Sequence, residues 1–197
     1  WYIHKGNKRS VNSSDDMKGS YLGTEFTQDD IEKELKLMGA NFEILKYEEL
    51  IDKTAELLST ESAIGWFQGR MEFGPRALGS RSILADPRSD KMQKNLNLKV
   101  KFRESFRPFA PSILRQDLSE WFDMNVESPY MLLVANINSN KNIEMTNEQK
   151  KLFGIDKLNI KRSKIPAVTH VDYSARVQTV TRETNNRYYD LILKFKE

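Results

Sequence analysis

Helical and extended patterns alternate through the first third of the sequence, and this alternation constrains the fold more than any other feature of the chain. Ile31, Leu35 and Met38 recur at the spacing of one helix face, and comparable patterns follow at short intervals. We expect a helix over 27–39, a short strand over 42–44, a helix over 48–58 and a strand over 63–67. Elements that alternate in this way favour an α/β fold, with helices packed against a twisted mixed β-sheet, over a helix bundle or a β-sandwich.

The second half of the sequence continues this alternation around one long polar insertion. Tyr130 begins a short apolar run typical of a buried strand, and the residues after it are rich in Asn, Lys and Ser. Such a composition indicates a solvent-exposed excursion. The expected elements are a buried strand over 130–134, the excursion over 136–164 with a helical patch at 148–153, β segments over 167–171 and 176–180, and a last helix capped by Thr184.

Composition excludes several kinds of chemistry. The 197 residues include no cysteine and two histidines, which excludes disulfides, thiol nucleophiles, iron–sulfur clusters and zinc-thiolate sites and leaves little for a histidine-rich metal site. No apolar run is long enough to span a bilayer, so we expect no membrane segment and a cytoplasmic location. The length suits one domain with an appended piece, and we expect a linker over 1–23 and the domain over 24–197.

Positive charge is concentrated in one segment of the chain. Between Arg70 and Arg115 lie seven arginines and four lysines against four acidic residues, a net charge of +7 in a chain whose total is +3. The rest of the chain is therefore acidic overall. The simplest reason for such a concentration of cations is an anionic ligand.

The segment over 69–82 follows a predicted strand and combines glycines with three arginines. Gly74 allows a tight turn, and Pro75 suits the first position of a short helix whose free N–H groups would attract an anion. Arg70, Arg76 and Arg81 are candidates to clamp the oxygens of such an anion. The segment is not a P-loop, because Ser-Arg-Ser stands where Lys-[Ser/Thr] is required. The alternative is a structural turn with surface arginines.

The segment over 99–111 sets cations against aromatic residues. Lys101, Arg103 and Arg107 are candidate ligands for phosphate, and the neighbouring phenylalanines suit stacking on a base, in nucleic acid or in a single nucleotide. The alternative interpretation places Phe102, Phe106 and Phe109 in the core and the cations on a solvated face. Three phenylalanines near two prolines would in either case fix the loop rigidly.

The segment over 169–178 is predicted to form a strand, a turn and a strand. Ser174 and Arg176 lie two residues apart on one strand, so both side chains would point to one face and could meet one phosphate or carboxyl group. We interpret His170 as structural. No histidine or cysteine stands at metal-ligand spacing from it, so the sequence predicts no metal site. A Ser–His–Asp triad with Asp172 is disfavoured, since no nucleophile-elbow pattern is present.

Together these segments resemble the C-terminal region of the carbamoyltransferase family that includes the NodU and CmcH proteins and antibiotic O-carbamoyltransferases. The resemblance runs from about Tyr21 to the end of the chain. The stretches that carry it are GWFQGRMEFGPRALG at 65–79, RSILADPR at 81–88, KFRE at 101–104, FRPFAP at 106–111, and VD with SARVQ at 171–178.

The resemblance implies a YrdC-like domain that binds ATP and carbamoyl phosphate and forms carbamoyl-adenylate. A separate N-terminal domain, related to the actin-like ATPases, would then transfer the carbamoyl group to a hydroxyl acceptor and would hold the transfer metal and the acceptor site. Mg²⁺ is expected to accompany ATP. The resemblance implies Lys101, Arg103 and Arg176 as catalytic residues. It places Lys101, Arg103 and Arg107 on the phosphates or the carbamoyl group, and Ser174 and Arg176 on the adenylate. It places Arg70, Arg76 and Arg81 in an adjoining anion pocket.

The sequence departs from the family pattern at a few positions. Ser105 stands where proline is frequent, and Tyr173 stands where glycine is frequent. The family also continues after Tyr188 into a segment containing Gly-x-Pro-Val-Leu, so we expect a domain truncated at its C-terminus, with at most the adenylate-forming half reaction. Two other functions remain open: a module that binds RNA or single-stranded nucleic acid, and a docking partner for the preceding domain without a ligand of its own.

Overall fold

Helices outnumber strands over the residues that the computed structural model describes, which are 4–8 and 15–197. The remainder of the expected linker, residues 1–3 and 9–14, lies outside the described residues. The helices are α1 (Gln28–Leu37), α2 (Tyr47–Ser59), α3 (Met92–Lys99), α4 (Leu118–Trp121), α5 (Asn147–Lys151), α6 (Gly154–Leu158) and α7 (Asn186–Lys196). The strands are β1 (Ile64–Phe67), β2 (Arg81–Leu84), β3 (Ser112–Leu114), β4 (Leu133–Asn136) and β5 (Ser174–Val180). None of these helices is long and apolar enough to cross a membrane.

The strands form two separate sheets. β1 and β2 pair in antiparallel register, with Phe67 opposite Arg81. β5 lies in the middle of a three-stranded sheet, where it runs parallel to β3 and antiparallel to β4. The predicted α/β class with mixed strand directions is therefore confirmed, although the strands are divided between two sheets.

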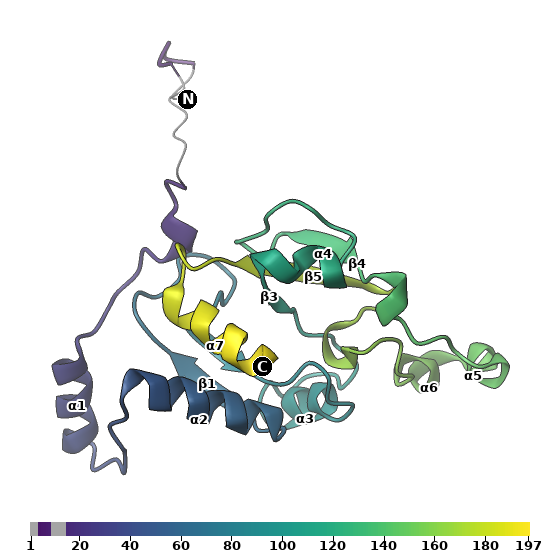
Figure 1. The fold of residues 1–197 in the computed structure, drawn as a ribbon, viewed down its shortest axis with the longest axis horizontal. Coiled ribbons are helices and arrows are strands. Elements are labelled where there is room, and N and C mark those ends of the chain that lie inside the picture. The colour runs from purple at the N-terminus through teal and green to yellow at the C-terminus, as the bar shows by residue number, and fades with distance from the viewer. Residues whose placement is uncertain (1–3, 9–14) are drawn as a thin grey trace.

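Two apolar clusters hold the helices against these sheets. One joins α2 and α7 to β1 and includes Leu58, Trp66 and Leu191. The other packs α4 onto the three-stranded sheet through Leu118 and neighbouring residues. β5 contributes to both clusters, and Figure 1 shows α2 and α7 side by side on one side of the molecule with α4 near the three-stranded sheet. Burial of each leucine side chain contributes about 1.5–3 kcal/mol to the stability of this arrangement.

Helix α1 stands apart from this body (Figure 1). Its start is fixed locally, because the Thr27 hydroxyl accepts the Asp30 N–H at 3.2 Å while the Asp30 carboxylate accepts the Thr27 N–H at 3.2 Å. None of its residues is buried. The helices predicted over 27–39 and 48–58, the strand over 63–67 and the exposed excursion that carries α5 and α6 are all confirmed.

Two of the expected strands are absent from the described residues. Residues 42–44 are irregular, since β1 takes β2 as its partner and no other strand lies beside this segment. Residues 167–171 fail as a strand because Pro166 begins a 3-10 turn, Pro166–Val168. The strand predicted over 176–180 is confirmed within β5.

The strand expected over 130–134 is shifted along the chain and is not buried. β4 begins at Leu133, and its Leu133 and Val134 side chains are 42% and 58% exposed. An apolar run predicts burial, but β4 lies at the edge of its sheet and only its Ala135 is buried.

The N-terminal cap of α7 differs from the predicted one by one residue, because the Asn185 side chain, rather than Thr184, accepts the Tyr188 N–H at 3.1 Å.

Candidate anion-binding site

A cavity of about 440 Å³ lies between the two apolar clusters. Its size is within the usual range of small-molecule sites. Its lining includes apolar side chains such as those of Leu58 and Phe195 together with four cations. These cations are Arg76, Lys101, Arg103 and Arg176.

Among the described residues, Arg76 and Arg176 each bring an unpaired buried donor to this lining. The Nε atoms of both side chains are buried and have no hydrogen-bond partner in the part of the chain that the structure describes. Burial lowers the pKa of Arg176, and the positive charge of Arg76 lowers it further. Two neighbouring guanidinium groups with unpaired buried donors are costly in a free protein, and an anion that accepts from both would remove that cost.

Arg103 is held in place by the buried residue Asn97. Its Nε donates to Asn97 Oδ1 at 2.6 Å, and its guanidinium lies 4.9 Å from the centre of the Phe109 ring. The Asn97 amide also donates to the carbonyl oxygens of Ser105 at 3.1 Å and Arg107 at 2.8 Å. Asn97 therefore shapes the whole loop after α3 and directs Arg103 to the cavity.

Of the three phenylalanines of this loop, only Phe109 packs against an apolar cluster. Phe102 and Phe106 are 84% and 41% exposed, so the alternative interpretation that places all three in the core is wrong. Phe102 has a φ of +48°, in the left-handed region that turns the chain between Lys101 and Arg103.

The loop that carries Arg76 is organised by the buried carboxylate of Glu72. Its Oε1 accepts the N–H groups of Leu78 and Ser80 at 2.8 Å and of Arg81 at 3.1 Å. The short helix expected at Pro75 does not form, as residues 71–80 are irregular. The Leu78 N–H, which lies in the segment expected to bind an external anion, is thus occupied by a carboxylate of the protein itself.

The far end of this loop is fixed by the Leu78 carbonyl oxygen. It accepts from the Tyr21 hydroxyl at 2.7 Å and from Gln178 Nε2 at 2.8 Å. Gln178 lies two residues after Arg176 on β5, so both side chains share one face of the strand, and both line the cavity. The hydrogen bond from Gln178 to the Leu78 carbonyl oxygen therefore connects the loop that carries Arg76 to the strand that carries Arg176.

The other predicted arginines lie outside the cavity lining. Arg70 donates to the Gly23 carbonyl oxygen at 3.1 Å and faces Glu25. Arg81 donates to the Gln68 carbonyl oxygen at 2.6 Å and covers the Phe67 ring. Arg107 is exposed, with its Nε 3.7 Å from Glu104 Oε2. The structure does not bring Arg70 and Arg81 into the cavity lining with Arg76, nor Arg107 with Lys101 and Arg103, because backbone oxygens, acidic side chains and an aromatic ring engage these three side chains elsewhere.

Ser174 also lies outside the cavity lining, despite its spacing from Arg176. Its hydroxyl donates to Asp172 Oδ1 at 2.7 Å and lies 3.0 Å from His170 Nδ1. The hydroxyl is thus placed between the carboxylate and the imidazole, which is not the order of a catalytic triad. Within the described ranges, no group of three His, Cys, Asp or Glu side chains could hold a metal ion.

Sequence reasoning missed the residues that support the cations. Glu72, Asn97 and Gln178 each position a loop or a strand of the site. The sequence alternation of β5 could have identified Gln178, because side chains two residues apart on a strand lie on one face and Gln178 is two residues after Arg176. Glu72 and Asn97 carried no such signal, because most of their partners are backbone groups rather than patterned side chains.

We expect Asn97→Leu to loosen the loop after α3. The change leaves the carbonyl oxygens of Ser105 and Arg107 without their donor and should lower the free energy of unfolding by about 2–4 kcal/mol. Gln93→Leu is the matched control, because Gln93 donates from the same helix to the Phe106 carbonyl oxygen at 2.7 Å in an exposed position. Urea denaturation of both variants tests this, and equal losses would contradict the role given to Asn97.

The fold and the cavity define an α/β domain that gathers cations from distant parts of the chain around one hollow. The family model that matches is that of the carbamoyltransferase C-terminus, over residues 55–197. The chain therefore belongs to the carbamoyltransferase C-terminal domain family.

Relatives of this chain are longer proteins. The uncharacterised protein sll1178 of Synechocystis is 52% identical over 198 residues, which cover 100% of this chain and 32% of that protein. Nodulation protein NolNO of Sinorhizobium fredii is 40% identical over 170 residues, 85% of this chain and 22% of that protein. The 3'-hydroxymethylcephem-O-carbamoyltransferase of Streptomyces clavuligerus is 36% identical over 140 residues, 71% of this chain and 22% of that protein. The chain spans about a third or less of the length of these relatives.

Proposed function

We propose that this domain binds ATP and carbamoyl phosphate in the cavity and forms carbamoyl-adenylate. A preceding domain of a longer polypeptide would then pass the carbamoyl group to a hydroxyl acceptor. The observation that carries the proposal is the pair of buried, unpartnered Nε atoms of Arg76 and Arg176 in the same lining as Lys101 and Arg103. Membership of the carbamoyltransferase C-terminal family and the similarity to a cephem O-carbamoyltransferase support the choice of carbamoyl phosphate.

The proposed reaction needs cations more than it needs acids or bases. Water cleaves the P–O bond of carbamoyl phosphate and releases phosphate, and an oxygen of the remaining carbamate then attacks the α-phosphorus of ATP and displaces pyrophosphate. Both substrates are polyanions, so positioned cations must offset their repulsion and stabilise the developing charge. We assign Arg76 and Arg176 to the phosphates of ATP, and Lys101 and Arg103 to carbamoyl phosphate. Ser174 receives no role, because its hydroxyl is engaged by Asp172.

Mg²⁺ is proposed to enter with ATP rather than to reside in the protein. Asp86 is the acidic residue of the described cavity lining, and both of its carboxylate oxygens accept from the Arg88 guanidinium. The residues present therefore suit an ion that is held by phosphates and water, as is usual for Mg²⁺ with nucleotides.

Calorimetric titration tests the proposal. A non-hydrolysable ATP analogue and carbamoyl phosphate are each expected to bind with one-to-one stoichiometry and to compete with inorganic phosphate. Loss of the affinity for carbamoyl phosphate in Lys101→Ala, which removes an exposed cation without altering the core, would support the assignment of Lys101. Absence of binding for both ligands in the intact chain would refute the proposal.

A nucleic-acid interface remains a second candidate because of one observation. Phe102 is 84% exposed between Lys101 and Arg103, as a base-stacking residue would be. Binding to nucleic acid would strengthen with oligonucleotide length and weaken steeply with salt, since several phosphates would be neutralised. A mononucleotide that competes fully with an oligonucleotide would exclude this candidate.

A further inference from the structure

A cluster of large apolar side chains is exposed where residues 20–24 pair with residues 71–73. Its members, which we call the flank face, are Leu22, Phe26, Phe67, Met71 and Phe73, and they are 45%, 53%, 58%, 42% and 70% exposed. The Phe26 and Phe67 rings lie 6.3 Å apart. Exposed apolar groups that gather in this way, rather than singly, indicate an interaction surface.

The flank face is rigidly built. The Gly23 N–H donates to the Met71 carbonyl oxygen at 2.9 Å, and the Phe73 N–H donates to the Ser20 carbonyl oxygen at 2.7 Å. The two segments approach so closely that a Cβ at Gly23 would lie 2.9 Å from Met71 Cβ. A surface with fixed backbone geometry loses little conformational entropy on docking.

Two arginines strengthen this surface. Arg70 bonds to the Gly23 carbonyl oxygen and faces Glu25, so it ties the two segments together. Arg81 donates to the Gly69 carbonyl oxygen at 3.0 Å and lies 3.5 Å over the Phe67 ring. Both cations thus border the flank face and do not line the cavity.

The sequence positions of the face indicate what covers it. The family match begins at residue 55, whereas Leu22 and Phe26 come before it. The Synechocystis relative aligns over the whole of this chain, so it includes both segments, and it is about three times as long. In a longer polypeptide of this kind, residues 15–26 are the part of the domain next to whatever precedes it.

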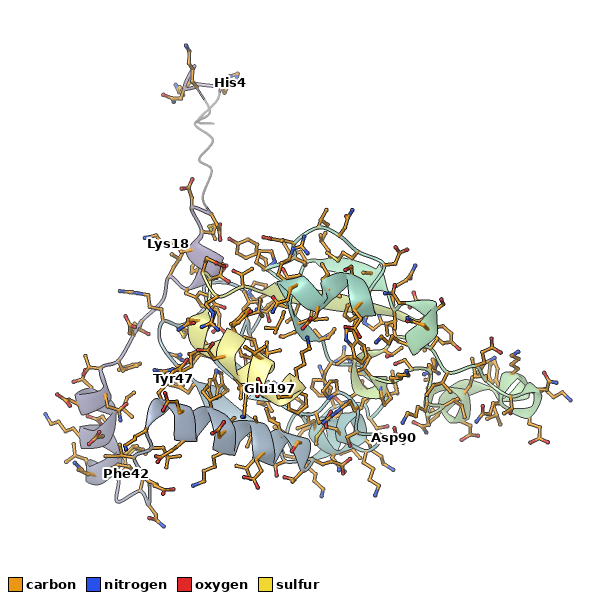
Figure 2. The ribbon with its side chains drawn as sticks, viewed as in Figure 1. His4, Lys18, Phe42, Tyr47, Asp90 and Glu197 are labelled. Carbon is orange, nitrogen blue, oxygen red and sulfur yellow. The ribbon has the colours of Figure 1, made fainter. Side chains whose placement is uncertain are left out.

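Helix α1 points to the same occupant. Figures 1 and 2 show the chain running along one edge of the molecule, from Lys18 past residues 21–27 to α1 and Phe42. A ten-residue helix with none of its residues buried is marginal by itself in water. Leu37 and Met38 at its end are 72% and 77% exposed, which extends the uncovered apolar surface along this edge.

We propose that the flank face is the docking surface for the preceding domain of the longer polypeptide. The inference rests on the two-domain arrangement of the proposed function, but not on the ligand of the cavity. Met71 and Phe73 are exposed while Glu72 between them is buried and organises the Arg76 loop. A domain docked on this face would therefore lie on the outer side of the segment whose inner side shapes the cavity.

Hydroxyl-radical footprinting tests the inference, because it measures the exposure of Met and Phe side chains. The samples are this chain alone and the full Synechocystis relative in which the matched 198 residues are replaced by this chain. Oxidation of Met71, Phe73 and Phe67 is expected to fall several-fold in the joined polypeptide. Phe153, which is 93% exposed in the excursion, is the internal reference and should not change.

Equal oxidation of Met71 and Phe73 in both samples would overturn the inference. Protection that rises with concentration in the chain alone would also overturn it, since the occupant would then be a second copy. In the joined polypeptide, M71D together with F73D should restore oxidation of Phe67 and increase the radius of gyration, whereas F153D should do neither. Titration of carbamoyl phosphate into the same samples separates this inference from the proposed function, because an empty cavity with a protected flank face would refute only the latter.

Discussion

Arg176→Met weakens the binding of the ATP analogue on the order of 100-fold, because it removes charge-assisted hydrogen bonds from a buried part of the cavity. The same change is expected to stabilise the free protein. Arg176 Nε is buried without a partner among the described residues, and Arg76 repels it. An apolar side chain of similar length relieves both costs and should raise the free energy of unfolding by about 1 kcal/mol. Calorimetry and thermal denaturation of one sample measure the two opposite effects.

Arg107→Met is the matched control for this prediction. It removes the same charge from the same basic segment, but Arg107 is exposed beside Glu104 and does not line the cavity. Its affinity for the ATP analogue is expected to change by less than about threefold, as for a screened surface charge. If both variants lost affinity equally, general attraction to a basic surface would explain binding and the cavity would not be the site.

Local physics made much of the fold predictable. The Thr27 cap and the helical spacing of Ile31, Leu35 and Met38 are properties of twelve neighbouring residues, and α1 forms where they indicate. The same holds for α2 and β1. Residues 42–44 and 167–171 show the limit of this reasoning, since alternation and apolar character predict a strand only where a neighbouring strand is available.

The site was less predictable because its assembly is nonlocal. Arg70, Arg76 and Arg81 are chemically alike and lie within one short segment, yet only Arg76 lines the cavity. What separates them is the Glu72 carboxylate, which turns the loop, together with the backbone oxygens that capture the other two side chains. The meeting of Arg76 with Arg176 depends on contacts between residues a hundred positions apart, which spacing does not encode.

The opposite expectations for affinity and stability at Arg176 have a common cause. The buried Nε atoms of Arg76 and Arg176 are placed to donate to an anionic ligand, and without that ligand their missing hydrogen bonds lower the stability of the protein. The surrounding structure offsets this cost through satisfied polar groups such as Glu72 and Asn97. The loop that carries Arg76 must therefore be firmly attached to the core, and Gly79 is where that attachment is closest.

Gly79→Ala should destabilise the fold by about 3–5 kcal/mol through strain and overpacking together. Gly79 has a φ of +100°, and a Cβ there would lie 2.3 Å from Cδ1 of Tyr188. The Tyr188 ring is buried in the cluster between α2 and α7, so it cannot move aside without opening that cluster. The midpoint of urea unfolding is the measurement.

Gly74→Ala and Gly65→Ala separate the two causes. Gly74 has a φ of +130° but nothing within 4 Å of an added Cβ, so it reports strain alone and should cost about 1–3 kcal/mol. Gly65 has neither a left-handed backbone nor a close neighbour, and its change should stay within about 1 kcal/mol. If Gly79→Ala lowered the free energy of unfolding no more than Gly74→Ala, the Tyr188 ring would have moved aside for the added Cβ. The attachment of the loop to α7 through Gly79 and Tyr188 would then be loose, which would contradict the prediction.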